Sequence, residues 1–346
     1  MEHNKVNTSS TNSARSDGLY KIVCFGNGTG QAALLQGFKN IPCTLTSIVG
    51  VTDNGGHSGL LRRELNIPSP GDLRRCLVAL ADSKLPLAKF LGHRFIEGGL
   101  KGVNLGNLVI AALIQQEGAL SDASKLLCRM LQLKARVFPV SDENTQVCAE
   151  LTDGTCLIGE WEIIERQPQT PIQRVYLQQP IHVYEGCQQA IAEADFIVFC
   201  PGSLFTGLIP LLLTEGIKET LASSQATKVY FCNLLTQTGQ TDEFTLRDHV
   251  RQLSYYLPAS PDYIVANNGP IPQELLEYYE GSNSCPVPLD RVEHESKLIT
   301  VDLVDHGEKK AGEVLRAYGK GVKGGLHWIA HHPVKSAQVL LQIMKQ

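Results

Sequence analysis

Short apolar runs alternate with segments of helical periodicity along most of the chain. The run at residues 20–25 ends in a glycine-rich turn, and the segment 31–38 after it places Leu34 and Phe38 on one side. A buried strand that gives way to a helix in this manner is typical of α/β sheets. A second apolar run follows at residues 45–51. The start of the chain therefore predicts a strand, a helix and a second strand.

The same alternation returns in the second half of the chain. A helix is predicted over residues 185–194, and the apolar run 195–200 ends in another glycine turn at 201–207. Two passages from strand to helix through glycine are expected for two halves of one parallel sheet. The remaining predictions are strands at 227–232, 262–266 and 298–303, and helices at 272–279 and from residue 333 to the C-terminus.

The pattern changes between these two halves. Residues 147–164 are predicted to form a hairpin, because polar and apolar positions alternate beside Asp153-Gly154, a strong turn signal. Together with apolar runs at 136–140 and 172–177, it indicates a small β-rich insertion around residues 136–180. Two helices are predicted before it, at 108–116 and 122–133. The whole pattern predicts one α/β domain over residues 19–346: a Rossmann-like, mostly parallel sheet with helices on both faces.

The turn after the first predicted strand consists of Gly26, Asn27, Gly28, Thr29 and Gly30. Backbone without side chains approaches a phosphate closely, and the helix behind the turn offers unpaired N–H groups and its positive dipole end. The turn matches neither standard phosphate motif. Gln31 stands where a dinucleotide fingerprint has its third glycine, and no Lys-Ser/Thr pair follows. A bare strand-to-helix turn remains the alternative.

A second glycine-rich loop follows the second predicted strand, at residues 52–59. Ligands of parallel α/β sheets bind at the carboxyl ends of the strands, so both loops should open onto one site, with Gly55 and Gly56 in it. Asp53 stands where a dinucleotide enzyme keeps the acid that grips a ribose hydroxyl, and its carboxylate also suits Mg²⁺. One carboxylate beside the neutral Asn54 is, however, a weak metal site.

Charged and amide side chains follow at two further helix starts. Asp72 fits either the N-cap of a helix or the ligand site, and the frequency of Asp at N-caps favours the cap. The amide of Asn107 fits a helix cap or a contact to a base or sugar. Arginines near the glycine loops are typical of a solvated face, but they are also candidates for holding a polyanion; they are Arg62, Arg63, Arg74 and Arg75.

Polar residues also stand at strand ends in the second half of the chain. Ser203 and Thr206, beside Gly202, can hydrogen-bond an anion. Asn233 and Thr236 follow the next predicted strand. Two glycine turns in one sheet favour a ligand that spans both halves.

Three histidines near the C-terminus suggest a metal site at first sight: His327, His331 and His332. Pro333 disfavours helical geometry at His332, and no acid or cysteine lies nearby in sequence. The sequence therefore argues against a metal ion at this cluster.

Composition narrows the class of protein. The chain has 346 residues, 43% of them hydrophobic, which is enough for a sizeable core. A net charge of −4 gives no general attraction for nucleic acid or an anionic membrane, and no apolar run reaches the roughly 18 residues of a membrane helix. Ten cysteines without a C-x-x-C pair indicate a reducing cytoplasm. The polar residues 1–18 predict a disordered tail and not a signal peptide.

Several motifs in order carry a resemblance over residues 20–346. The chain resembles the 2-phospho-L-lactate transferase-like (CofD-like) superfamily, and within it the bacterial gluconeogenesis factors (YvcK-like, UPF0052). The motifs are the turns 26–30 and 52–59, Pro70-Gly71-Asp72-Leu73-Arg74, Gly106-Asn107-Leu108, Thr152-Asp153-Gly154-Thr155 with Gly159-Glu160, Pro201-Gly202-Ser203-Leu204-Phe205-Thr206, and Cys232-Asn233-Leu234 with Thr236-Gln237.

The resemblance implies a Rossmann-like fold and a homodimer. The bacterial branch is associated with binding UDP-sugars such as UDP-N-acetylglucosamine, and with carbon metabolism and the control of cell wall and cell shape. The transferase branch is associated with a GDP-linked phospholactate, a deazaflavin acceptor and Mg²⁺. Both branches imply a nucleotide diphosphate at the glycine turns.

This chain departs from the family pattern at several positions. Relatives have glycine where Asn27 stands, and asparagine tolerates positive φ, so the turn can survive. The absence of a second acid at Asn54 argues against Mg²⁺. Ala330 replaces an arginine, which removes a charge-assisted contact. Further departures are His57 for serine, Arg75 for asparagine, Gly207 for serine and His332 for aspartate.

Three functions compete. The first is a nucleotide-sugar-binding regulatory protein, and the second is a Mg²⁺-dependent transferase acting on a nucleotide diphosphate-linked substrate. The third, an NAD-dependent oxidoreductase, lacks the third glycine. The absence of a paired carboxylate and of a nucleophile-and-base set favours the first, so no catalytic residue is assigned. The nucleotide-binding candidates are Gly26, Asn27, Gly28, Thr29, Gly30, Asp53, Asn54, Gly55, Gly56, Asp72, Arg74, Asn107, Gly202, Ser203, Thr206, Asn233, Thr236 and Tyr279.

Overall fold

The structure is a computed structural model that describes the chain except for residues 1–18, 168, 277–283, 293–295 and 306–328. The predicted tail, Tyr279 and His327 therefore lie outside the described residues. Within the described part, the main sheet has seven strands. They are β1 (Tyr20–Gly26), β2 (Cys43–Val49), β3 (Arg136–Pro139), β7 (Phe196–Phe199), β8 (Thr227–Phe231), β9 (Tyr263–Asn267) and β10 (Lys297–Val301).

All neighbouring strands of the main sheet are parallel, in the order β10-β9-β8-β7-β1-β2-β3. The order reverses between β1 and β7, which is the switch point of a doubly wound sheet. Apart from the edge strand β10, the strands are largely buried, because helices lie around the sheet as in other parallel sheets. The Rossmann-like architecture expected from the sequence is confirmed.

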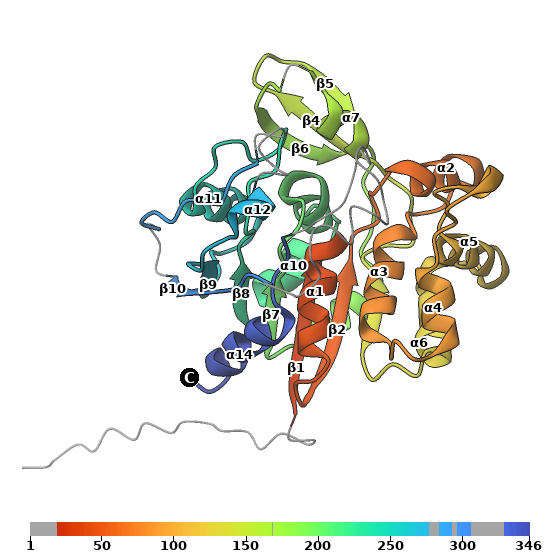
Figure 1. The fold of residues 1–346 in the computed structure, drawn as a ribbon, viewed down its shortest axis with the longest axis horizontal. Helices are drawn as coiled ribbons and strands as arrows, with labels where there is room; N and C mark the ends of the chain where they lie inside the picture. The colour runs from red at the N-terminus through yellow and green to blue at the C-terminus, as the bar shows by residue number, and fades with distance from the viewer. Residues whose placement is uncertain (1–18, 168, 277–283, 293–295, 306–328) are drawn as a thin grey trace, which may run out of the picture.

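The helices connect the strands. They are α1 (Gly28–Phe38), α2 (Gly56–Leu65), α3 (Gly71–Leu80), α4 (Pro86–Gly92), α5 (Leu105–Glu117), α6 (Leu120–Met130), α7 (Glu160–Glu165), α8 (Glu185–Ala192), α9 (Ile209–Leu212), α10 (Ile217–Ser223), α11 (Leu246–Tyr256), α12 (Gln273–Leu276) and α14 (Pro333–Ile343). Helix α1 packs against α3 and α14 (Figure 1). Helix α14 approaches α1 so closely that a Cβ atom at Gly37 would collide with the backbone of Pro333.

A small antiparallel sheet stands at the carboxyl edge of the main sheet (Figure 1). Its strands are β4 (Val147–Leu151), β5 (Cys156–Ile158) and β6 (Ile172–Leu177), in the order β5-β4-β6. Two predictions need correction. The run at 136–140, assigned to the insertion, forms β3 and pairs with β2 at the edge of the main sheet. The hairpin ends at Ile158, and the residues after it form α7.

Gln31 joins α1 to the sheet. The side chain is fully buried, and its Nε2 lies 3.1 Å from each of three acceptors: Cys24 O on β1, and Ser47 Oγ and Ile48 O on β2. Buried amides are stable only when bonded in this way. The position that breaks the dinucleotide fingerprint therefore fixes the first turn against both strands.

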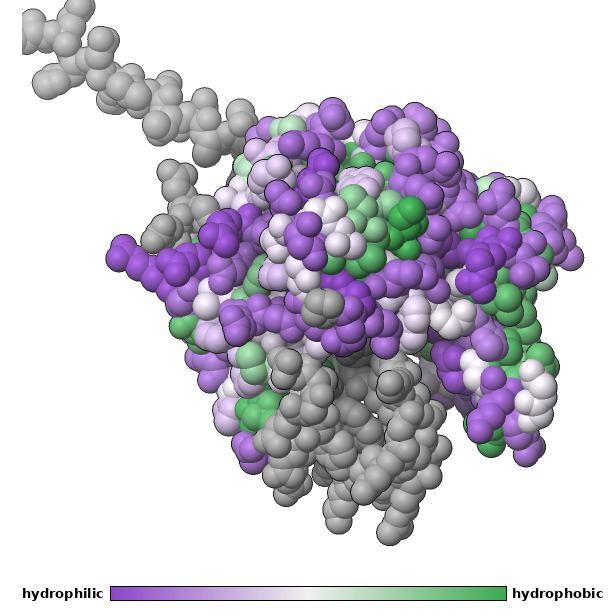
Figure 2. All heavy atoms as spheres, turned by 90° about the horizontal axis from the view of Figure 1, so that it is seen from above, coloured by the Kyte–Doolittle hydropathy of each residue, from purple (hydrophilic) through white to green (hydrophobic). Residues whose placement is uncertain are grey.

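The surface seen in Figure 2 is mostly polar, and the cysteines are not joined in disulfides. Seen from the side of the small sheet, the surface is mostly hydrophilic, with apolar side chains in separate small areas (Figure 2). All ten cysteines are free thiols. In the described part of the chain, no helix has the length and apolar character needed to cross a bilayer.

Candidate functional site

A cleft of about 780 Å³ opens at the carboxyl ends of β1, β2, β7 and β8. Helix α7 of the small sheet forms its opposite wall, so the insertion covers the switch point. The cleft brings together most of the predicted nucleotide-binding residues. These lining residues are Asn27, Gly28, Thr29, Gly30, Asp53, Asn54, Gly55, Gly56, Asp72, Arg74, Asn107, Gly202, Ser203, Asn233 and Thr236.

Two predicted residues do not line the cleft. Gly26 is the last residue of β1 and lies behind the turn. The Thr206 side chain is buried, and its hydroxyl lies 3.1 Å from Glu160 Oε1 and 3.3 Å from Gln240 Oε1. Thr206 therefore holds the wall of the cleft instead of facing a ligand.

The first turn differs in detail from the expectation. Asn27 is extended, with φ −151°, and the left-handed residue is Gly28, with φ +62°. A Cβ atom at Gly207 would collide with the Asn27 side chain. The Asn27 side chain, which replaces a glycine of the family pattern, thus fills the space that a side chain at position 207 would need. Gly207 itself replaces a serine of that pattern. Asn27 is tolerated because Gly207 makes room for it.

The glycine turns after β1 and β7 touch each other. A Cβ atom at Gly30 would collide with the Pro201 carbonyl group. The Asn233 side chain exchanges two hydrogen bonds of 2.9 Å with Gly202, accepting from its N–H and donating to its carbonyl oxygen. Thr236 Oγ1 accepts from Cys285 N at 3.0 Å. Asn233 and Thr236 therefore fix loops at the cleft, with most of their hydrogen-bonding capacity already used.

Asp53 and Asn54 lie in the loop after β2. Asp53 Oδ1 accepts from Gly55 N at 2.9 Å, which shapes the loop ahead of α2. Asn54 Oδ1 accepts from Trp161 N at 2.8 Å, and its Nδ2 donates to Glu162 Oε2 at 3.2 Å. Asn54 thus ties α7 to the main sheet, a role that no neighbouring residue in sequence could indicate.

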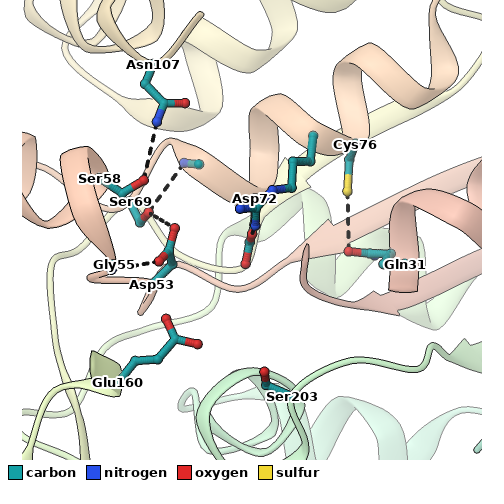
Figure 3. Close-up of polar contacts among 12 residues, drawn as sticks. Gln31, Asp53, Gly55, Ser58, Ser69, Asp72, Cys76, Asn107, Glu160 and Ser203 are labelled. Carbon is teal, nitrogen blue, oxygen red and sulfur yellow. Dashed lines mark hydrogen bonds and ion pairs between the residues drawn. The ribbon is translucent and has the colours of Figure 1, made fainter. Parts of the chain in front are cut away.

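Beside Asp53, the described lining of the cleft includes the acids Asp72, Glu160, Glu162 and Glu165. Asp72 is not the N-cap of α3; it lies in the first turn, buried, and pairs with Arg75. Burial raises the pKa of Asp72 to about 6, although the Arg75 charge opposes this. Glu160 points at Asp53 across the cleft (Figure 3). Burial, followed by the charges of Asp53 and Asp72, raises the pKa of Glu160 well above its usual range.

Asp53, the predicted Mg²⁺ candidate, lines the cleft together with Asp72 and Glu160. Among the described residues, no group of three or more side chains is arranged to hold a metal ion. Asp72 is paired with Arg75. Glu160 was missing from the sequence-based candidates, although it follows Gly159 in one of the quoted motifs.

The four arginines have separate roles. Arg62 does not line the cleft: its buried guanidinium donates to Thr52 O, Asp53 O, Thr145 O and Asn144 Oδ1. Arg63 and Arg75 line the cleft together with Arg94.

Arg74 lies in the cleft with an unsatisfied hydrogen-bond donor, although the charges of Asp72 and Asp53 act on it favourably. Arg74 is 7% exposed, and its buried Nε atom has no hydrogen-bond partner among the described residues. Burial, and then the charges of Arg75 and Arg94, lowers its pKa to about 10. A buried donor without a hydrogen-bond partner costs about 1–3 kcal/mol, and more when the group is charged. An anion in the cleft would satisfy this donor.

His331 is a core residue and not a metal ligand. It is buried, its Nε2 lies 3.0 Å from Cys232 O, and burial lowers its pKa to about 4. His332 caps α14, accepting from Val334 N and Lys335 N.

A pH effect on stability follows for His331. Because its folded pKa lies below the usual value near 6.5, the neutral ring stabilises the fold above that pH, and this contribution is lost as pH falls toward 4. We expect His331→Gln to lose about 3 kcal/mol less than the unsubstituted protein between pH 7 and pH 4. Urea unfolding across this range measures the difference. The exposed His182→Gln is the control, and a pH-independent difference for His331→Gln would contradict the assignment.

The fold and the cleft together show which class of protein this is. This is a Rossmann-like α/β protein whose switch-point cleft combines glycine turns with a buried arginine whose Nε lacks a hydrogen-bond partner among the described residues. The family model described as 2-phospho-L-lactate transferase CofD matches residues 22–305, and the chain belongs to this family.

Individual relatives agree with this membership. A Thermotoga maritima protein is 39% identical over 330 residues, covering 94% of this chain and 99% of its own. The gluconeogenesis factor of Bacillus subtilis is 39% identical over 273 residues, covering 78% and 86%. A crystal structure of a Bacillus halodurans protein superposes with a TM-score of 0.83 at 33% identity, covering 93% and 99%. A second structure of that protein is described as a member of the UPF0052 family.

Proposed function

We propose that this protein is a cytoplasmic regulatory protein that binds a nucleotide sugar, a UDP-sugar such as UDP-N-acetylglucosamine, through its diphosphate. The observation that carries the proposal is Arg74, a buried guanidinium at the cleft without a partner for its Nε. A diphosphate supplies the missing charge and accepts charge-assisted hydrogen bonds. The turns after β1 and β7 place bare backbone and the start of α1 beside it.

The size of the cleft supports a ligand larger than a phosphate ion. Its volume of about 780 Å³ falls within the range of about 300–1,000 Å³ for small-molecule sites. Arg63, Arg75 and Arg94 add positive charge to its lining. Relatives named gluconeogenesis factors support a role in carbon metabolism. A role in the control of cell wall and cell shape is part of the same proposal. The homodimer, and the absence of nucleic-acid and membrane partners, belong to the same proposal.

Calorimetric titration tests the proposal. The purified protein is titrated with UDP-N-acetylglucosamine, GDP and NAD, each with and without Mg²⁺, and each ligand is then recovered and analysed. The proposal expects micromolar binding of the UDP-sugar without a strict need for Mg²⁺, and the ligand intact. Ligand breakdown would instead indicate a transferase. Binding of NAD alone would refute the assignment of the first turn.

A further inference from the structure

Helix α5 lies in a lobe with α2, α4 and α6, and one of the apolar areas of the surface lies over this lobe, at the right of the view in Figure 2. Helix α5 has seven successive apolar residues, from Leu108 to Ile114. Seven residues make almost two helical turns, so every side of this part of the helix is apolar. A helix of this kind is expected to be buried on every side.

One side of α5 is not covered by the described part of the chain. Ala112 is exposed, and Leu108 and Val109, which lie one turn before it on the same side, are only partly buried. Ile110 and Ile114, on the other side, belong to the core. The sequence of α5 is therefore that of a core helix, although one of its sides faces outward.

Neighbouring segments of the lobe also expose apolar side chains. They are Leu60 and Leu65 on α2 and, on the hairpin of residues 93–104, Ile96 and Leu100. Ile96 is 78% exposed, which is the highest value among the large hydrophobic side chains of the described residues. Single exposed apolar residues are ordinary, but several on one lobe mark an interaction surface.

Hydrogen bonds join the hairpin, α5 and α2 into one unit. Phe95 N donates to Val103 O at 2.9 Å across the hairpin. Asn104, at the end of the hairpin, caps α5 by accepting from Asn107 N. Asn107 Nδ2 in turn lies 3.3 Å from Ser58 Oγ on α2. The three segments therefore present a surface of fixed shape.

The charges on these segments favour a second copy of the chain as the partner. Exposed side chains of both signs stand side by side: Arg63 and Glu64 on α2, and Glu97 and Lys101 on the hairpin. A surface that carries both signs can pair with itself, because a two-fold axis can bring the basic groups of one copy to the acidic groups of the other. A polyanionic partner would instead need a surface of one sign.

We infer that the outward side of α5, together with the exposed apolar residues of α2 and the hairpin, forms the interface of a two-fold homodimer. Helix α5 packs against α5 of the second copy, with Ala112 near the axis, where its small side chain lets the two helices approach closely. The inference rests on the homodimer of the proposed function and names the surface that forms it. Ligand binding in the cleft is a separate property.

A charge at position 112 tests the inference. Ala112 is exposed, so Ala112→Arg should fold; Ala222→Arg, at an exposed position on α10, is the matched control. Sedimentation velocity over a range of concentrations gives the oligomeric state, and thermal unfolding monitors the fold. We expect the unsubstituted protein and Ala222→Arg to be dimers. The dissociation constant of the Ala112→Arg dimer should rise about 100-fold or more, because like charges meet at the axis.

Mixing two variants distinguishes a specific interface from general damage to the lobe. Ala112→Arg and Ala112→Glu should each be monomeric alone, because each charge meets its own copy across the two-fold axis. An equal mixture should form mixed dimers, in which opposite charges meet. Damage to the fold would not be rescued by mixing.

The outcomes separate the inference from the proposed function. An Ala112→Arg dimer as stable as that of the unsubstituted protein would overturn the α5 interface and keep the homodimer. Failure of the mixture to form mixed dimers would overturn the pairing of α5 with its own copy. An unsubstituted protein that is monomeric at micromolar concentrations would overturn the interface and the homodimer, whether or not it binds UDP. A dimer that Ala112→Arg dissociates would support the interface even if the unsubstituted protein failed to bind UDP, a failure that refutes only the nucleotide part of the proposed function. If Ala112→Arg does not fold, Leu60→Arg, on α2 where the side chain is 43% exposed, provides the same test.

Discussion

Arg74→Met is expected to weaken diphosphate binding and, at the same time, to stabilise the ligand-free protein. Methionine keeps much of the side-chain volume but removes a buried charge whose Nε lacks a partner. Relief of that charge should raise the free energy of unfolding by about 1–3 kcal/mol. Loss of charge-assisted hydrogen bonds should weaken UDP by about 10- to 100-fold. If replacing Arg74 weakens ligand binding but stabilises the free protein, the role of Arg74 is to bind the ligand.

Two measurements establish the opposite signs. Urea unfolding without ligand gives the stability change, and calorimetry with UDP gives the affinity change. Arg129→Met, the same replacement at an exposed position near the end of α6, should alter both by little. A destabilised Arg74→Met protein would show that the guanidinium is satisfied within the fold, and the main support for an anionic ligand would be lost.

Arg62→Met is expected to destabilise the protein strongly, by about 3–5 kcal/mol. The next residue, Arg63, lines the cleft, but the guanidinium of Arg62 binds protein atoms. It joins the loop after β2, through Thr52 O and Asp53 O, to Asn144 and Thr145 at the entry to the small sheet. Removing it leaves several buried acceptors unpaired.

Urea unfolding of Arg62→Met measures this loss, with Arg129→Met again as the control. Arg62→Lys should recover only a small part of the stability, because one ammonium group cannot replace the geometry of the guanidinium fork. A change below about 1 kcal/mol for Arg62→Met would mean that these hydrogen bonds are replaced by water.

The backbone of the site was predictable, whereas its side-chain roles were not. Glycine turns after apolar runs predict where a parallel sheet opens, because both the strand period and the turn are local properties of the chain. The exact fit at Gly207 could not be predicted, since it depends on Asn27, which is far away in sequence. The same holds for Asn54, whose partners Trp161 and Glu162 belong to α7.

The errors in the predicted secondary structure had a similar cause. The short apolar run at 136–140 would have the same pattern in an insertion as at the edge of the main sheet. Only its pairing with β2 shows that it belongs to the main sheet. Glu160 was missed because the alternation of the hairpin was extended through residues that form α7. In both places, a contact distant in sequence overrode the local pattern.

The contact between α1 and α14 determines when this protein can finish folding. Residues 28–38 lie near the start of the chain, and residues 333–343 cover one side of them. During synthesis, an apolar side of α1 stays uncovered until residues 333–343 have left the ribosome. Until then, the nascent chain carries an exposed apolar surface of the kind that favours aggregation. Loss of residues 333–346 would leave that side permanently bare, together with the Tyr20 hydroxyl that donates to Met344 O.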